Sequence, residues 1–152
     1  MTKAARALLS FLRTRKLKLA AAESCTGGLL TAALTEIPGS SDVVDRGFVT
    51  YSDAAKQKML GVPARTLTKF GAVSRQTALA MAKGALSHAD ANIAVAITGI
   101  AGPGGGSDQE DAWRKSGRGR KGARDRGRAK DHGLDDRARR RRAAIPDIVW
   151  LL

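Results

Sequence analysis

The segment Asn92-Ile93-Ala94-Val95-Ala96-Ile97-Thr98 decides the fold class of this chain. It is an almost continuous apolar run of strand length, which is typical of a parallel β-strand covered by helices on both faces. Before it comes an alanine-rich helix that Ser74 is suited to cap. The apolar stripe of that helix comprises Ala78, Leu79, Ala82, Ala85 and Leu86. A helix that leads into a buried strand is the repeating unit of α/β folds.

Helical and strand periodicities alternate through the first forty residues. Helical spacing predicts a helix over residues 2–12, with Thr2 as a candidate N-cap, and residues 17–21 alternate at strand spacing. A second helical face begins near Thr26 and stops at Pro38-Gly39, because proline cannot continue a helix. The chain is therefore expected to begin with a helix, a strand and a helix.

The central part of the chain continues this alternation. Residues 47–51 are β-branched and aromatic, which favours a strand. Ser52 or Asp53 is suited to cap a short helix that runs to Leu60, and Pro63 suits the first turn of another helix. Together with the buried strand described above, this order predicts an α/β fold, a three-layer α/β/α sandwich with a mainly parallel sheet.

Charge divides the chain into two parts. Its 152 residues carry 27 Lys and Arg against 14 Asp and Glu, a net charge of +13, and the density of charged residues more than doubles after Ser107. We expect one globular domain over residues 1–107 and a disordered, basic Arg/Gly-rich tail over residues 108–152. The tail has too few apolar side chains to offset the entropy of ordering it, except for the short apolar end from Ile145 to Leu152.

Composition excludes several classes of protein. Cys25 is the single cysteine, which excludes a disulfide framework and a cysteine-rich zinc site and indicates a reducing compartment. Apolar runs such as 93–97 are far shorter than the roughly 20 residues of a membrane helix. Residues 1–16 lack the apolar core of a signal peptide, and we interpret His88 and His132 as surface residues without partners that would support a metal site. We therefore expect a cytoplasmic protein with no metal and no membrane partner.

The first candidate site is Ala22-Glu23-Ser24-Cys25-Thr26-Gly27-Gly28, where the first strand gives way to a helix. Ligands of open α/β sheets bind at this end of a strand, and the next helix offers backbone N–H groups. Ser24 is the preferred nucleophile, because the two glycines let the backbone approach a substrate closely. Cys25 is a second candidate nucleophile, although a small buried thiol is the simpler interpretation. Alternatively, Ser24 or Thr26 serves only as an N-cap.

The second candidate site is Thr50-Tyr51-Ser52-Asp53-Ala54-Ala55-Lys56, again at the end of a strand. Burial and a positive helix end would disfavour the charged form of Lys56, which could then act as a general base. Serine–lysine pairs are a hydrolytic variant of the serine–histidine arrangement. The hydroxyl of Tyr51 could relay a proton or orient the amine. Alternatively, Lys56 is a solvated surface residue and Tyr51 belongs to the core.

The third candidate site is the glycine-rich run Thr98-Gly99-Ile100-Ala101-Gly102-Pro103-Gly104-Gly105-Gly106. Backbone N–H groups of such a loop can hold a phosphate, although the run matches neither the Walker nor the dinucleotide-binding spacing. A phosphate-bearing substrate fits this loop, and a flexible linker into the tail is the alternative. The candidate substrate-binding residues here are Thr98, Gly99, Gly102 and Gly105.

These segments, in this order, resemble the C-terminal domain of the CinA family of competence/damage-inducible proteins, which includes nicotinamide-nucleotide amidohydrolases. The resemblance covers about residues 5 to 107. Its matching stretches are A-E-S-C-T-G-G at 22–28, P-G-S-S at 38–41, G-F-V-T-Y-S-D-A-A-K at 47–56, L-G-V at 60–62, G-A-V-S at 71–74 and A-I-T-G-I-A-G-P-G-G-G at 96–106.

The resemblance implies an α/β/α sandwich enzyme that hydrolyses the carboxamide of nicotinamide mononucleotide to nicotinate mononucleotide and ammonia, without metal or other cofactor. It implies Ser24 as the nucleophile and Lys56 as its base, with Tyr51 nearby. Backbone N–H groups of Thr26, Gly27 and Gly28 would stabilise the oxyanion. Arg46 and the glycine-rich loop could hold the phosphate or sugar of this small-molecule substrate.

The sequence departs from the family after Ser107. The family continues with further sheet-forming segments, whereas this chain continues with Asp108-Gln109-Glu110-Asp111-Ala112-Trp113-Arg114 and an Arg- and Gly-rich run. Such composition is typical of a shifted reading frame in GC-rich coding sequence, so we interpret the tail as a frameshift product. The sheet would then be incomplete at its C-terminal end, with an unpaired edge that a second copy in a homodimer could cover.

A protein without enzyme activity is the alternative hypothesis. In it the basic tail, residues 114–142 above all, binds nucleic acid by neutralising phosphates, with strong dependence on salt. Trp113 is the single aromatic residue of the tail before Trp150, so the tail offers no stacking platform for single strands.

Overall fold

The structure is a computed structural model that describes residues 2–100 and 148–151. The helices in these ranges are α1 Thr2–Thr14, α2 Leu29–Thr35, the 3-10 helix η1 Ser40–Asp42, α3 Asp53–Leu60, α4 Ala64–Phe70 and α5 Arg75–Ser87. The strands are β1 Leu19–Glu23, β2 Val44–Val49, β3 Ile93–Thr98 and β4 Ile148–Leu151. Neighbouring strands are parallel and lie in the order β2-β1-β3-β4.

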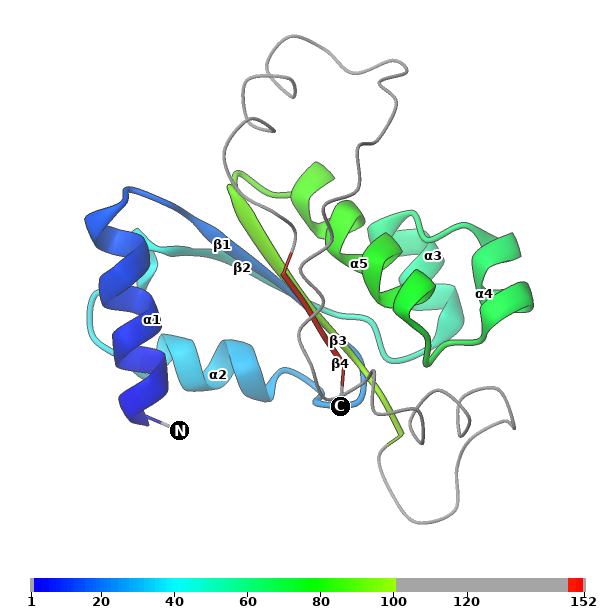
Figure 1. The fold of residues 1–152 in the computed structure, drawn as a ribbon, viewed down its shortest axis with the longest axis horizontal. Coiled ribbons are helices and arrows are strands. Elements are labelled where there is room, and N and C mark those ends of the chain that lie inside the picture. Colours follow the sequence, from blue (N-terminus) through cyan, green and yellow to red (C-terminus); the bar gives the residue numbers. More distant parts are fainter. Residues whose placement is uncertain (1, 101–147, 152) are drawn as a thin grey trace, which may run out of the picture.

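Helices cover both faces of the sheet, with α1 and α2 on one side and α3, α4 and α5 on the other (Figure 1). Strand β3 supplies both cores: Ile93, Val95 and Ile97 pack with α1 and α2, whereas Ala94 and Ala96 pack with α5. This two-sided burial is why the sequence of β3 is continuously apolar. The predicted three-layer α/β/α sandwich with a parallel sheet is confirmed.

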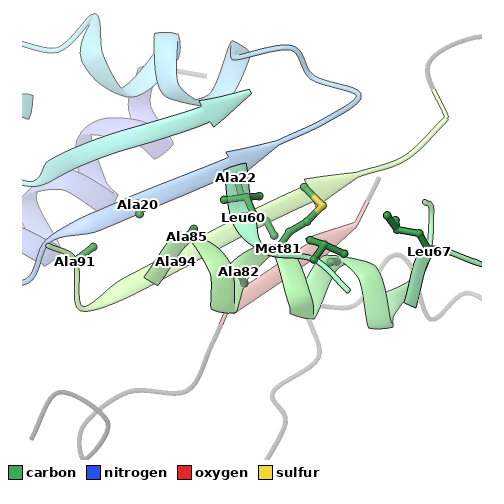
Figure 2. Packing of buried hydrophobic residues seen from close by; sticks show 12 residues of the cluster. Ala20, Ala22, Leu60, Leu67, Met81, Ala82, Ala85, Ala91 and Ala94 are labelled. Carbon is green, nitrogen blue, oxygen red and sulfur yellow. The ribbon is translucent and has the colours of Figure 1, made fainter. Parts of the chain in front are cut away.

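Small side chains let α5 lie close to the sheet. The strands contribute Ala20, Ala22, Ala94 and Ala96 to this face. Met81 of α5 and Leu60 of α3 fill the space above them (Figure 2). A Cβ atom at Gly84 would collide with the carbonyl oxygen of Leu60, so α5 and α3 approach through a position that only glycine can occupy. The core thereby fixes α3 against the sheet.

Helix α2 begins later than its sequence pattern predicts. The apolar spacing suggested a start near Thr26, but the helix starts at Leu29. Gly27 and Gly28 adopt φ angles of 58° and 102°, in the left-handed region that a right-handed helix cannot contain. A four-residue turn, residues 25–28, therefore separates Ser24 from the helix.

Strand β2 also differs from the predicted range of 47–51, because it spans Val44–Val49. It pairs with β1 from Val44 opposite Leu19 to Val49 opposite Glu23. The residues that follow, Thr50 and Tyr51, leave the sheet and turn toward α3. The predicted caps of α3 and α5 are confirmed, since the side chains of Ser52 and Ser74 accept backbone N–H groups of the first helical turns.

The last strand lies within the range expected to be a disordered tail. Ile148–Leu151 pairs in parallel with β3, where Val95 lies opposite Ile148. These four residues belong to the apolar end of the tail, and they occupy a strand edge whose backbone groups would otherwise lack a partner. The sequence expectation had set this apolar end apart from the rest of the tail. Residues 101–147, to which the frameshift hypothesis mainly refers, lie outside the described residues.

Two kinds of feature are absent from residues 2–100 and 148–151. No helix there is long and apolar enough to cross a membrane. No group of three or more His, Cys, Asp or Glu side chains in the same ranges could hold a metal ion.

Candidate active site

The carboxyl ends of three parallel strands bring the predicted site segments together. Ser24 follows β1 and donates its backbone N–H to the carbonyl of Ile97 in β3, at 2.9 Å. Thr50 follows β2 and donates its backbone N–H to the carbonyl of Glu23, at 2.7 Å. Thr98 is the last residue of β3. Parallel pairing therefore places the three strand ends side by side at one edge of the sheet.

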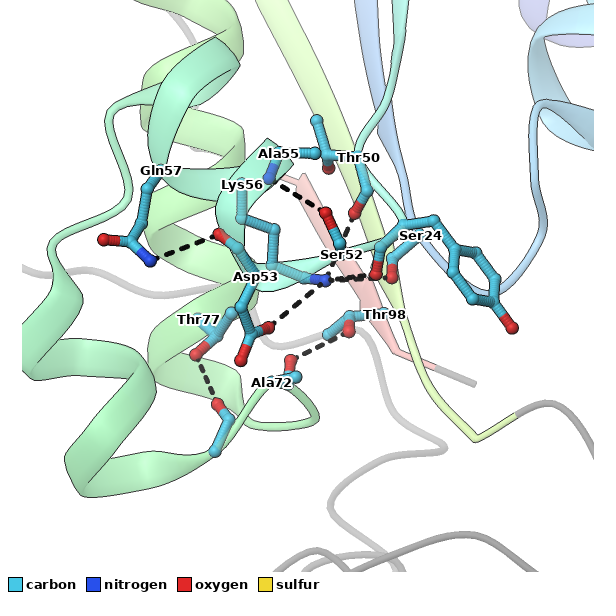
Figure 3. Close-up of polar contacts among 12 residues, drawn as sticks. Ser24, Thr50, Ser52, Asp53, Ala55, Lys56, Gln57, Ala72, Thr77 and Thr98 are labelled. Atoms are coloured by element: carbon cyan, nitrogen blue, oxygen red, sulfur yellow. Dashed lines mark hydrogen bonds and ion pairs between the residues drawn. The ribbon is translucent and has the colours of Figure 1, made fainter.

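Lys56 reaches into this edge from α3. The helix begins after Ser52, whose hydroxyl accepts the N–H of Ala55 at 3.1 Å, so Lys56 lies one turn inside the helix. Its side chain is only 1% exposed and points toward Ser24, which is also buried (Figure 3). Lys56 Nζ lies 3.2 Å from Ser24 Oγ. The alternative of a solvated surface lysine is therefore wrong.

Two backbone carbonyls orient the amine. Lys56 Nζ lies 3.1 Å from the carbonyl oxygen of Thr50 and 3.0 Å from that of Tyr51. A neutral lysine amine has two N–H donors and one lone pair. If the two donors serve the two carbonyls, the lone pair faces the hydroxyl of Ser24. The turn after β2 thus holds Lys56 in the orientation that a general base for Ser24 needs.

Burial changes the protonation of Lys56. Desolvation lowers the pKa of Lys56 from its ordinary value, and the carboxylate of Asp53 opposes this shift. Asp53 Oδ1 lies 3.8 Å from Lys56 Nζ. The net direction is downward, so the neutral amine is more accessible at Lys56 than at an exposed lysine.

Glu23, which sequence reasoning left without a role, is a fully buried carboxylate beside Ser24. It accepts four hydrogen bonds, from the hydroxyl of Thr26, the N–H of Leu30, and both the N–H and the hydroxyl of Thr31, at 2.6 to 3.0 Å. Burial raises the pKa of Glu23, but these hydrogen bonds outweigh burial and leave its pKa below the ordinary value. Glu23 therefore ties the turn after Ser24 to the first turn of α2 as an anion.

The glycine turn lies directly after the serine. The N–H of Gly27 donates to the carbonyl of Ser24 at 3.0 Å, and the N–H of Leu29 donates to the carbonyl of Thr26 at 3.1 Å. Gly28 faces Val49, since a Cβ there would lie 3.4 Å from Val49 Cγ2. These contacts close the turn tightly around the backbone of Ser24.

Tyr51 and Arg46 are placed differently from the expectation. The side chain of Tyr51 is 67% exposed, so it does not belong to the core, and the group that contacts Lys56 is its carbonyl. Arg46 pairs with Ala20 of β1, four residues before Ser24, which is about 13 Å along the strand. The guanidinium of Arg46 donates to the carbonyl of His88 and to the carboxylate of Asp45. Arg46 is therefore not brought to the edge that holds Ser24.

The start of the glycine-rich loop does lie at this edge. The buried hydroxyl of Thr98 donates to the carbonyl of Ala72 at 2.9 Å, which ties the end of β3 to the segment before α5. Gly99 follows directly and is partly buried. Gly102 and Gly105, the other loop residues with a predicted role, lie outside the described residues.

Cys25 lies next to Ser24 and is partly buried. Desolvation raises the pKa of its thiol. A cysteine nucleophile needs the thiolate, and a raised pKa disfavours the thiolate at neutral pH. The geometry and the protonation of the site thus both favour Ser24 over Cys25.

The fold and this edge define an α/β protein that carries a buried serine–lysine pair, an arrangement found among hydrolases. The chain matches the model of the CinA C-terminal domain over residues 1–113. This match covers most of the chain, and the protein belongs to the CinA C-terminal domain family.

Curated relatives and solved structures agree with this assignment. A CinA-like protein of Syntrophobacter fumaroxidans is 58% identical over 99 residues, which are 65% of this chain and 23% of that protein. A nicotinamide-nucleotide amidohydrolase PncC of Enterobacter agglomerans is 57% identical over 89 residues, 59% of this chain and 54% of that protein. The crystal structure of a competence/damage-inducible protein from Agrobacterium tumefaciens is 61% identical, with a TM-score of 0.69 over 72% of this chain and 66% of that chain. The chain thus spans about a quarter of the CinA-like relative and about half of the amidohydrolase.

Proposed function

We propose that this chain is an amidohydrolase that converts nicotinamide mononucleotide to nicotinate mononucleotide and ammonia. The observation that carries the proposal is the position of Lys56 Nζ, 3.2 Å from Ser24 Oγ and held by two backbone carbonyls. The identity to an amidohydrolase of pyridine nucleotides supports the choice of substrate. The single cysteine, Cys25, fits action in the cytoplasm.

In the first half-reaction Ser24 Oγ attacks the carboxamide carbon while neutral Lys56 takes the hydroxyl proton. The C–N bond breaks as Lys56 returns this proton to the departing nitrogen, which leaves as ammonia. The product is an ester between the nicotinate carboxyl carbon and Ser24. The amide carbonyl oxygen becomes an oxyanion, for which the proposal uses N–H groups of the turn 25–28 other than that of Gly27, which already donates to Ser24.

In the second half-reaction water replaces Ser24. Lys56 accepts a proton from the attacking water, and the ester C–O bond breaks as Lys56 delivers that proton to Ser24 Oγ. The acid so formed loses its remaining proton to solvent, nicotinate mononucleotide leaves as a carboxylate, and Lys56 is again neutral. Thr98 and Gly99 begin the loop that the proposal assigns to the mononucleotide. No step of the proposed mechanism needs a redox change or a Lewis acid.

Ammonia release from nicotinamide mononucleotide tests the proposal. We expect turnover by the full chain and its loss in both Ser24→Ala and Lys56→Ala. Cys25→Ala is the matched control, because it changes a neighbouring side chain without removing either proposed catalytic group. Absence of ammonia release from folded wild-type protein, or full activity in Ser24→Ala, would overturn the proposal.

A further inference from the structure

Asp53 is the one carboxylate that the described residues place within 4 Å of Lys56 Nζ. Its side chain is 55% exposed, whereas that of Lys56 is 1% exposed. The two residues lie on the same face of α3, three positions apart. Among the described residues, the buried Lys56 ammonium therefore has a single counter-charge, the Asp53 carboxylate, and this carboxylate is accessible to solvent.

The other described groups around the Lys56 amine do not act as its counter-charge. Ser24 and the carbonyls of Thr50 and Tyr51 are neutral. Cys25, from the turn after β1, is kept as a thiol by burial, which raises its pKa. Glu23 directs both carboxylate oxygens to α2 and its preceding turn.

Helix α5 packs directly on α3. It does so through a face of small and apolar side chains, namely Ala78, Met81, Ala82 and Ala85. Burial therefore lowers the pKa of Lys56, and Asp53 opposes this shift most strongly, ahead of a smaller contribution from Cys25.

We propose that Asp53 is a positioning residue that holds the Lys56 ammonium and thereby sets the pH above which Lys56 can activate Ser24. This inference rests on the proposed function only in taking Ser24 as the group that Lys56 activates. Removing the carboxylate leaves the buried ammonium without a counter-charge, so Lys56 loses its proton at lower pH. The acid limb of a rate–pH profile should move in the same direction.

The size of the shift follows from the exposure of Asp53. Ion pairs with an exposed partner are screened by water, and a coupling of this kind moves a titration by up to about 0.7 pH units. On the acid side of the limb, Asp53→Asn should therefore react up to about five-fold faster than the wild type. Added salt should reduce this difference.

A purely structural role for Asp53 predicts a different result. Asp53 is the first residue of α3, where an acidic side chain favours the helix terminus. Loss of that effect would lower stability, and with it the amount of active protein, at every pH. It would not move the midpoint of the acid limb.

The test measures how fast a fluorophosphonate labels Ser24 in the full chain between about pH 5 and 10, with the adduct located by peptide mass spectrometry. Asp53→Asn should shift the midpoint to lower pH, and Asp53→Glu should restore it. Asp42→Asn is the matched control, because Asp42 pairs with Arg13 on the surface at 3.6 Å. An unchanged midpoint in Asp53→Asn, or an equal shift in Asp42→Asn, would overturn the inference.

This labelling separates the inference from the choice of substrate. If Ser24 is labelled and the midpoint moves but no ammonia is released from nicotinamide mononucleotide, the role of Asp53 stands and the substrate is wrong. If Ser24 is not labelled in folded wild-type protein, the serine is not activated and the role of Asp53 is refuted.

Discussion

Two buried ionisable residues, Glu23 and Lys56, lie beside Ser24, and their surroundings have opposite effects on their charged forms. In the turn from β1 to α2, Glu23 accepts four hydrogen bonds and its pKa lies below the ordinary value. In the connection from β2 to α3, Lys56 contacts neutral acceptors and one half-exposed carboxylate, and its pKa is lowered mainly by burial. The first arrangement keeps a charge, and the second favours losing one.

This difference separates a structural charge from a chemical one. A buried anion with four hydrogen-bond donors stabilises the turn that carries the serine, and these donors favour its ionised form. A buried amine whose charged form lacks such compensation is available as a base. The same edge of the sheet therefore contains a fixed anion that holds the nucleophile and a titratable amine that activates it.

The largest expected effect comes from removing the amine. Lys56→Met keeps an unbranched side chain of similar length, so labelling of Ser24 by a fluorophosphonate should slow by about a thousand-fold or more. The melting temperature should stay the same or rise, because a buried charge is replaced by an apolar group. Labelling that persists at the wild-type rate would show that another group activates the serine.

The next largest effect should come from replacing Glu23, and it should be a loss of stability. Glu23→Gln puts an NH₂ group where hydrogen-bond donors now point, so we expect a loss of about 2 to 4 kcal/mol in the free energy of unfolding. Chemical denaturation measures this loss. Glu36→Gln is the matched control, because Glu36 is exposed. Equal stability of the two variants would contradict the structural role assigned to Glu23.

A smaller effect should appear in the pH dependence of stability. Between the lowered pKa of folded Lys56 and the ordinary pKa of an unfolded lysine, the unfolded chain binds more protons than the folded one. Wild-type stability gained from this group is therefore lost as the pH falls through that window. Relative to Lys56→Met, the wild type should gain about 1.4 kcal/mol with rising pH for each unit by which the pKa is lowered. Parallel stability curves for the two proteins would refute the lowered pKa.

Glu23 should also make stability depend on pH, but at acid pH. Its lowered folded pKa gives stability that is present above the ordinary pKa of a glutamate and is lost as the pH falls through the folded value. Glu23→Gln should therefore lack this part of the acid destabilisation. Acid unfolding followed by circular dichroism, with Glu36→Gln alongside, measures it.

The smallest effect is expected at Cys25. Because its raised pKa keeps the thiol protonated, Cys25→Ala should change the rate of Ser24 labelling by less than about three-fold. The same assay measures it. A loss comparable to that of Lys56→Met would mean that the thiol takes part in the chemistry.

Periodicity and caps predicted much of the fold. The buried strand β3 and the caps at Ser52 and Ser74 follow from local patterns, and the structure confirms them. The start of α2 could not be found from apolar spacing, because the left-handed backbone at Gly27 and Gly28 decides it. The pairing of β4 depends on contact across the chain, which no local pattern contains.

The candidate site was predictable where residue type determines chemistry. Ser24 and the segment that contains Lys56 follow strand ends, which parallel strands place at one edge of a sheet, so a shared edge could be expected. Whether Lys56 reaches Ser24 could not be established from the sequence. The orientation of the amine could not, because backbone carbonyls accept its hydrogen bonds and every residue type supplies such a carbonyl. Glu23 could have been recognised as an acidic residue just before a helix start. Arg46 shows the opposite case, since its charge suited a phosphate but its register placed it far from Ser24.

The most direct test of the contrast between Glu23 and Lys56 is a carbon-13 NMR titration of the lysine side chains of the full chain, with the Lys56 signal assigned by its loss in Lys56→Met. The account predicts that Lys56 titrates below the range of the other lysines, and that its midpoint falls further in Asp53→Asn. A midpoint for Lys56 at or above the ordinary lysine value would contradict the account, because the amine beside Ser24 would then be a cation at the pH at which it must act as a base.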